Sequence, residues 1–290
     1  MHLFSKPIEE IIRQRYSCRT YVKQPIHTDL QRRITDYIAT LGAGPFGGSA
    51  RFELIAARDK DLKMLRQLGT YGFIKGATGF LVGVMTNGEE DLEDFGWLME
   101  RLVLYVTDLG LGSCWLGGTF TKRSFMQKVS AQSTEFIPAI LSVGYIAPKP
   151  RKVDRLIRRG GNFDRRLNHD RLFFIERFGA ALTLSEAAEY ALPLEMVRLA
   201  PSASNRQPWR VIRMNDRYHF YLRRTPGYRE SSLNRLFAKS DLQRIDMGIA
   251  MCHFELTARE IGLMGEWVKD DPGIEIPDEL STYSATWLSQ

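Results

Sequence analysis

The sequence predicts an α+β protein, in which helices cover small and mostly antiparallel sheets. Long stretches with apolar residues at helical spacing alternate with short runs of branched and aromatic residues, which are typical of strands. Two such runs, 209–214 and 218–222, flank Asn215-Asp216 and predict a β-hairpin. Landmarks of the first part of the chain also recur in the second part, so we expect two similar halves.

The first half is expected to begin with two helices, over 7–16 and 28–41. Asp29 lies near the start of the second helix, where a negative charge stabilises the helix dipole. Strands are expected at 52–56, 80–85 and 139–145.

Each half also contains a long amphipathic pattern that predicts one central helix with a single buried face. The first apolar stripe consists of Leu92, Phe95, Met99, Leu102, Val103, Val106 and Leu109. The second consists of Leu242, Ile245, Ile249, Cys252 and Leu256. A Gly-Leu pair follows each stripe, at Gly110 and at Gly262.

Two pairs of segments indicate an internal duplication. The segments 44–55 and 200–212 share one pattern. Each contains a small residue and proline, then glycyl or polar residues, an aromatic residue and two aliphatic ones. The Gly-Leu pair is followed by a small residue and tryptophan at 109–115 and again at 261–267. The two landmarks have similar separations in both halves, which favours duplication over coincidence.

Basic residues concentrate in 149–171, and a Gly160-Gly161-Asn162 break inside this segment is typical of a linker. We therefore divide the chain into halves at 1–165 and 166–290. The net charge of +6 arises largely here, but aromatic residues do not alternate with the basic ones, so nucleic acid is not an expected partner. A solvated linker and a contact with an anionic cofactor phosphate are both consistent with this segment.

The composition, with 44% hydrophobic and 26% charged residues, is ordinary for a globular protein. No signal peptide and no membrane span are expected, because apolar runs stay shorter than the roughly 18 residues that a span requires. The three cysteines lack a CxxC pair and the five histidines lack ligand spacing. We therefore expect no metal site, no disulfides and a cytoplasmic location.

The segment 200–210, Ala-Pro-Ser-Ala-Ser-Asn-Arg-Gln-Pro-Trp-Arg, is rich in hydrogen-bond donors. Pro208 disfavours a helical conformation at Gln207, so a helix must end before this segment and a strand can begin after it. The sequence predicts a rigid polar corner, and such loops often carry binding sites. An ordinary polar turn is the alternative.

This corner resembles the Pro-Ser-x-x-Asn-x-Gln-Pro-Trp signature of the FMN-dependent nitroreductase family. Two more segments resemble family motifs. Residues 12–21, Ile-Arg-Gln-Arg-Tyr-Ser-Cys-Arg-Thr-Tyr, are similar to its opening Arg-x-Ser-x-Arg-x-aromatic motif, and 109–118 is similar to its Gly-rich turn after the central helix. In ordinary members the corner closely follows the opening motif, whereas here it lies in the other half.

A fused and degenerate pair of nitroreductase units, as in the subfamily of TM nitroreductases, accounts for this order. Ordinary members are homodimers that bind FMN at the interface. Here the first half keeps the opening motif and the Gly-rich turn, while Phe46, Gly47 and Gly48 replace the polar corner that the second half keeps. The resemblance implies one flavin site shared by both halves, and a monomer with internal pseudo-two-fold symmetry.

The phosphate of FMN requires cations and hydrogen-bond donors. Arg15 and Arg19 flank Tyr16 and Ser17, and guanidinium groups match phosphate oxygens bidentately. Solvated arginines at a helix end are the alternative. By position, Arg165 and Arg166 resemble the basic residues that close over the phosphate in the family.

The flavin ring requires donors and acceptors at its edge and small residues at its face. The corner offers the Asn205 side chain and the backbone of Pro201, Ser202 and Ala203. Gly117 and Gly118 allow close approach. Tyr71 and Lys75 precede a strand where the family's ring-contacting segment lies, and Lys75 could stabilise negative charge at N1–O2 of the ring, although a surface lysine is the alternative.

The resemblance implies an FMN-dependent oxidoreductase that passes electrons from NADH or NADPH to a small-molecule acceptor, such as a nitroaromatic or a quinone, with ping-pong kinetics. No catalytic side chain is expected, because flavin N5 carries the chemistry. The sequence indeed lacks GxSxG and GxGxxG motifs. The alternatives are a flavin-binding redox sensor or FMN store without turnover, and a basic interaction module without flavin.

Other aromatic residues and a histidine are expected to be structural. Core packing is expected for Trp97, Trp115, Trp209 and Trp267. His253 lies beside an apolar stripe and is expected to pack between helices, and Trp287 lies in an acidic, proline-containing tail without an assigned role.

Overall fold

The computed structural model describes residues 4–57, 65, 68–86, 92–160, 163, 165–227 and 240–290, except for the side chains of 157–159. The elements of the first half are α1 (Ile8–Gln14), α2 (Thr28–Thr40), β1 (Arg51–Ala56), β2 (Gly79–Thr86), α3 (Leu92–Asp108), β3 (Gly112–Leu116), α4 (Lys122–Lys128), β4 (Glu135–Phe136), β5 (Ile140–Gly144) and α5 (Lys152–Gly160). Those of the second are η3 (His169–Arg171), β6 (Phe173–Ile175), α6 (Leu184–Ala187), η4 (Ala188–Tyr190), α7 (Ala191–Leu199), η5 (Ala203–Asn205), β7 (Trp209–Met214), β8 (Arg217–Arg223), α9 (Leu242–Glu260), β9 (Gly265–Val268) and β10 (Ser281–Ser289).

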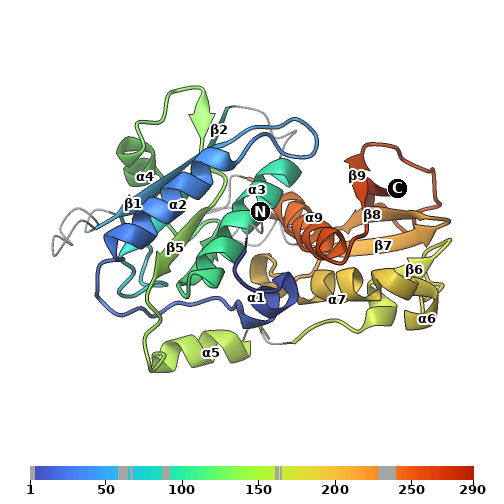
Figure 1. Cartoon of the computed structure of the whole chain (residues 1–290), viewed down its shortest axis with the longest axis horizontal. Helices are drawn as coiled ribbons and strands as arrows, with labels where there is room; N and C mark the ends of the chain where they lie inside the picture. Colours follow the sequence, from blue (N-terminus) through green and yellow to red (C-terminus); the bar gives the residue numbers. More distant parts are fainter. Residues whose placement is uncertain are drawn as a thin grey trace.

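Two sheets confirm the α+β class. The first has the strand order β1-β2-β5-β3, with β4 beside β2, and all its pairs are antiparallel. The second has the order β6-β7-β8-β10-β9, in which only the described pair β6–β7 is parallel. In Figure 1 the sheets lie on opposite sides of the central pair α3 and α9. The chain is therefore two α+β halves joined by their central helices.

The two central helices cross at glycines. A Cβ atom on Gly96 of α3 would lie 2.2 Å from the carbonyl oxygen of Ile245, and one on Gly248 of α9 would lie 1.8 Å from that of Glu93. The two contacts have the same spacing along both helices, so α3 and α9 are related by an approximate two-fold axis. Only glycine permits backbones to approach so closely.

Both central helices also end in the same way. Gly110 and Gly262 follow α3 and α9 with left-handed φ angles of 78° and 86°, a conformation that favours glycine at a helix C-terminus. Each turn leads into a strand, β3 or β9, and these strands place Trp115 and Trp267 at matching positions. The repeated helix, turn and strand support the predicted duplication.

One apolar core runs through both halves. The largest cluster of buried side chains includes Leu81 and Phe95 from the first half, and Phe220 and Trp287 from the second. The halves therefore bury apolar surface against each other. Within the described ranges, no helix is both long and apolar enough to cross a membrane.

Most predicted elements are present, with three differences. The first helix ends at Gln14 instead of Tyr16, because Arg15 has an extended backbone with ψ of 130°. The predicted Gly-rich turn at 109–118 contains the strand β3, and the supposed tail after Asp270 contains β10, which pairs with both β8 and β9. Trp287 on β10 is fully buried in the core. The run of threonine and aromatic residues at 282–287 is typical of a strand and was the local signal for β10.

Candidate functional site

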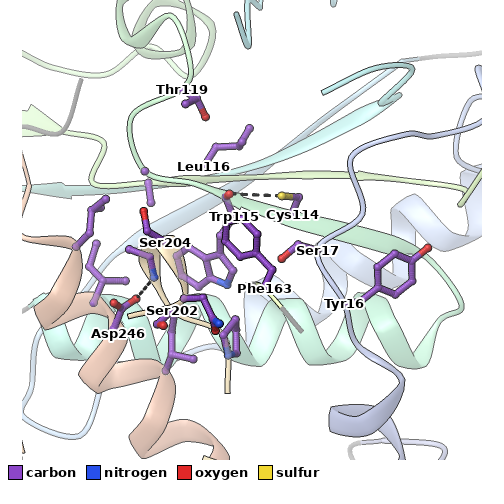
Figure 2. Close-up of a pocket in the computed structure, with 18 of the residues that line it drawn as sticks. Tyr16, Ser17, Cys114, Trp115, Leu116, Thr119, Phe163, Ser202, Ser204 and Asp246 are labelled. Carbon is purple, nitrogen blue, oxygen red and sulfur yellow. Dashed lines mark hydrogen bonds between the residues drawn. The ribbon is translucent and has the colours of Figure 1, made fainter. Parts of the chain in front are cut away.

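A cavity of about 630 Å³ lies between the two halves. Figure 2 shows Ser204 and Asp246 to the left of Trp115 and Ser17 to its right. Most predicted cofactor-binding residues line this cavity, namely Arg15, Tyr16, Ser17, Arg19, Tyr71, Gly117, Gly118, Arg166, Pro201, Ser202, Ala203 and Asn205.

Lys75 and Arg165 are not among the lining residues, and the structure shows a backbone role for both. The N–H of Lys75 donates to the carbonyl oxygen of Arg19 at 2.9 Å, and its own carbonyl accepts from Tyr21 at 2.9 Å. The carbonyl oxygen of Arg165 accepts from the side-chain amide of Asn205 at 2.9 Å. These backbone bonds fix neighbouring segments rather than bring the two cations to the cavity.

The cationic end of the cavity is built from the segment after α1. Ser17 forms a parallel bridge with Ser113 of β3, and the N–H of Cys18 donates to the Ser113 carbonyl at 2.8 Å. These bonds hold the segment against β3, and Arg15 and Arg19 of this segment both line the cavity. Guanidinium groups in a cavity lining are suited to bind an anion.

The segment 71–75 forms part of the cavity mouth. Arg151 donates from Nη1 to the carbonyl oxygen of Gly72 at 3.1 Å and from Nη2 to that of Phe73 at 2.8 Å. Tyr71 and Phe73 line the cavity while remaining 58% and 40% exposed. They present aromatic surface to any planar ligand that enters.

The polar corner has a strained backbone that side chains hold in place. Ser204, Asn205 and Gln207 have left-handed φ angles of 51°, 54° and 50°, which are unfavourable for residues other than glycine. The N–H of Gln207 donates to Ser202 Oγ at 2.8 Å, and Gln207 Oε1 accepts from the N–H of Leu167 at 2.8 Å. Ser202 and Gln207 therefore shape the corner, and strain of this kind is common where a ligand binds.

Asn205 and Arg166 connect the corner to the chain that crosses between the halves. Arg166 Nη1 donates to Asn205 Oδ1 at 3.1 Å, and Arg166 Nη2 donates to the carbonyl oxygen of Leu199 at 3.2 Å. The same guanidinium also donates to the carbonyl oxygen of Phe163 at 3.0 Å. A cation from the crossing segment is thus fixed at the cavity wall, beside the corner.

Asp246 of α9 was not predicted to belong to the site. Its side chain is 2% exposed and lines the cavity. Oδ1 accepts a hydrogen bond of 2.9 Å from the N–H of Ala203, drawn as a dashed line in Figure 2. Burial raises the pKa of this carboxyl group well above its usual value. An acid inside an apolar helical stripe was the signal that could have revealed it.

Trp115 packs against the apolar core, as expected, and is also half-buried at the cavity wall. Its indole N–H donates to Glu100 Oε2 at 2.8 Å. Trp209 and Trp267 are buried, as expected, and Trp97 packs against the core.

His253 packs between helices as predicted. The ring is fully buried, with Nε2 2.9 Å from Glu100 Oε1 and Nδ1 3.0 Å from the carbonyl oxygen of Met196. In the described part of the chain, no cluster of His, Cys, Asp and Glu side chains is arranged to hold a metal ion.

The place in the first half that corresponds to the polar corner is closed. Asp94 accepts hydrogen bonds from the N–H groups of Phe46, at 3.1 Å, and Gly48, at 2.7 Å. The ammonium of Lys269 lies 4.1 Å from the centre of the Phe46 ring. Lys269 follows Trp267 at the spacing with which Gly117 follows Trp115, so a long side chain stands where the cavity has a glycine.

The two fused α+β halves, with a cavity shared between them, define a nitroreductase-like protein. The chain belongs to the TM nitroreductase family, described as "Putative TM nitroreductase", whose pattern matches residues 7–258. The predicted family is thereby confirmed, and the chain is an oxidoreductase of the nitroreductase type.

One solved structure agrees with this fold over the whole chain. A nitroreductase of Thermotoga maritima has a TM-score of 0.60 at 20% identity, and the match covers 99% of this chain and 96% of that one. A nitroreductase family protein of Clostridium difficile matches with a TM-score of 0.40 at 20% identity, over 52% of this chain and 90% of its own. No curated protein matches the sequence significantly. At 20% identity, the likeness to the Thermotoga maritima protein shows the fold alone.

Proposed function

We propose that the chain binds FMN in the cavity and passes electrons from NADH or NADPH to a nitroaromatic, a quinone or a similar acceptor. The observation that carries this proposal is the division of the cavity between the halves. Arginines of the opening motif form one wall, and the polar corner forms another. FMN has a matching division between an anionic phosphate and a flat ring with hydrogen-bonding edges.

The residues present fit this group. Arg15 and Arg19 would hold the phosphate, because guanidinium groups pair with phosphate oxygens in bidentate geometry. Arg166 would add a fixed positive charge beside the corner. The corner backbone at 201–205 would contact the ring edge. Gly117 lets Leu242 pack at the cavity wall, because a Cβ atom there would lie 2.5 Å from the Leu242 side chain. The volume of about 630 Å³ lies in the usual range for cofactor pockets, about 300–1,000 Å³.

The bound flavin would supply the redox chemistry, accepting hydride at N5 and returning electrons to the acceptor. The residues of the chain would bind the cofactor, orient the substrates and exclude water. Tyr71 and Phe73 form an exposed aromatic mouth. We expect the nucleotide and the acceptor to use this mouth in turn, which gives ping-pong kinetics.

An absorbance spectrum of the purified protein tests the proposal. We expect a flavin spectrum, directly or after addition of FMN, that NADH or NADPH bleaches without oxygen and that a quinone or nitroaromatic then restores. Flavin released by heat should elute as FMN, since the cavity pairs its cations with a single phosphate. A protein that binds no flavin overturns the proposal. A flavin that neither nucleotide bleaches would instead favour a redox sensor or FMN store.

A further inference from the structure

The two carboxyl oxygens of Asp246 differ in their hydrogen bonding. Oδ1 accepts the N–H of Ala203 at 2.9 Å. Oδ2 is buried and has no hydrogen-bond partner among the described residues. A buried polar atom without a partner is unfavourable, so its retention at the wall of a binding cavity points to a ligand.

The internal duplication provides a comparison within the same molecule. Asp94 follows Glu93 on α3 as Asp246 follows Ile245 on α9, and Glu93 and Ile245 make matching contacts at the helix crossing. In the first half, where the cavity is closed, both oxygens of Asp94 accept backbone N–H groups, from Phe46 and from Gly48. In the first half, both oxygens of the acid therefore accept hydrogen bonds from the backbone. In the second half, only Oδ1 of Asp246 does so, and Oδ2 has no partner among the described residues.

The surroundings of Asp246 favour a neutral carboxylic acid. The side chain is 2% exposed, and none of the ion pairs among the described residues includes it. The charged groups that act on it, Asp241 and Glu100, are themselves acidic. Burial, followed by the repulsion from these acids, keeps the pKa of Asp246 well above its usual value. In the neutral form, Oδ2 carries a proton and becomes a hydrogen-bond donor.

We propose that Asp246, as a neutral acid, donates a hydrogen bond from Oδ2 to an acceptor atom on the edge of the flavin ring. This inference rests on the proposed binding of FMN in the cavity. A donor at the ring edge stabilises the negative charge that the ring gains on reduction. Asp246 would therefore strengthen flavin binding and raise its reduction potential, whereas an ionised carboxylate at the same place would lower that potential.

Two substitutions separate this role from that of a structural cap. In Asp246→Asn, the amide keeps an acceptor for Ala203 and a donor toward the cavity, so we expect FMN affinity within about 2-fold of the parent protein. Asp246→Ala loses the donor, so we expect FMN to bind about 2- to 12-fold more weakly, as for one lost hydrogen bond, and its reduction potential to fall. Asp94→Asn is the matched control, and it should lower thermal stability without changing FMN affinity or potential.

The protonation state is tested on the flavin-free protein. An infrared difference spectrum between the parent protein and Asp246→Asn at neutral pH should contain the carbonyl band of a protonated carboxyl group. Absence of this band overturns the inference. It is also overturned if Asp246→Ala lowers thermal stability but leaves FMN affinity and potential unchanged, or if Asp246→Asn weakens FMN as much as Asp246→Ala does. A parent protein that binds no FMN would count against the proposed function, whatever the infrared result.

Discussion

At the scale of single residues, Arg166 connects three parts of the site through one guanidinium group. It donates to the crossing segment at Phe163, to the end of α7 at Leu199 and to the corner at Asn205. Each bond fixes the orientation of the cation before a ligand arrives. A prearranged cation binds an anion more tightly than a mobile one, because less side-chain freedom is lost on binding.

Arg15 and Asn205 test whether one site spans both halves. Arg15→Ala removes a cation that the first half contributes, and Asn205→Ala removes the amide that orients Arg166 at the corner. Each change should cost about 1–3 kcal/mol of binding free energy, or roughly 5- to 150-fold in FMN affinity. Titration of FMN, followed by flavin fluorescence, measures both effects.

Ser49→Ala is the control for these two variants. Ser49 is exposed and lies just beyond the closed corner of the first half. It should leave FMN affinity unchanged, because Phe46 and Lys269 close the corresponding place. If Ser49→Ala weakens FMN as strongly as Asn205→Ala does, the assignment of a single site between the halves is incorrect.

At the scale of elements, the ion pair between Arg51 of β1 and Glu135 of β4 joins two strands that lie on either side of β2. Arg51 Nη2 lies 2.9 Å from Glu135 Oε2, and this pairing lowers the pKa of Glu135 from 4.5 to about 2. The carboxyl group is less basic in the folded protein than in the unfolded chain. Its contribution to stability is therefore present above pH 4.5 and is lost as the pH falls toward 2.

Glu135→Gln should make stability less dependent on pH in this window. We expect the parent protein and the variant to differ in free energy of unfolding at neutral pH, and the difference to shrink as the pH approaches 2. Urea unfolding at a series of pH values measures this. A difference that stays constant across the window would show that the ion pair does not contribute.

The close crossing of α3 and α9 should make the stability of the protein sensitive to a larger residue at Gly248. Gly248→Ala would place a Cβ atom 1.8 Å from the carbonyl oxygen of Glu93, so the helices must separate. We expect a loss of about 1–3 kcal/mol in the free energy of unfolding, as for other overpacked sites. Gly42→Ala is the control, since a Cβ atom there meets nothing within 4 Å, and it should change stability by at most about 1 kcal/mol. Equal losses in both variants would contradict a close crossing.

The amphipathic helices and the hairpin could be predicted from sequence because their patterns are local. The opening motif and the corner could also be found, since their residues are contiguous. Asp246 could not, because it lies in an apolar helix and reaches the cavity only through the packing of the two halves; the same holds for the cavity contact that Trp115 adds to its core packing. The absence of Lys75 and Arg165 from the cavity lining could not be predicted either, because position along the sequence does not determine which residues line a cavity.

At the scale of the whole molecule, the continuous core makes a further prediction. The halves already bury apolar surface against each other, which in ordinary members is the task of a second subunit. We expect a folded monomer that binds one FMN per chain. Light scattering combined with flavin absorbance measures both quantities. Two flavins per chain, or an obligate dimer with a shared site, would contradict the expectation, whereas weak association through another face would not.

The closed corner of the first half has a consequence for how such a protein can change over generations. In a homodimer one gene specifies both sites, so every substitution that suits one site is imposed on the other. Here Phe46 and Lys269 belong to the closed side only, while Gly117 and Ser202 belong to the open side. Each side is encoded by its own part of the chain and can mutate independently of the other. A mutation can therefore change the remaining site without changing a symmetric copy of it. The site can thus adapt to an asymmetric substrate, whereas a two-fold dimer would carry the same change in both of its sites.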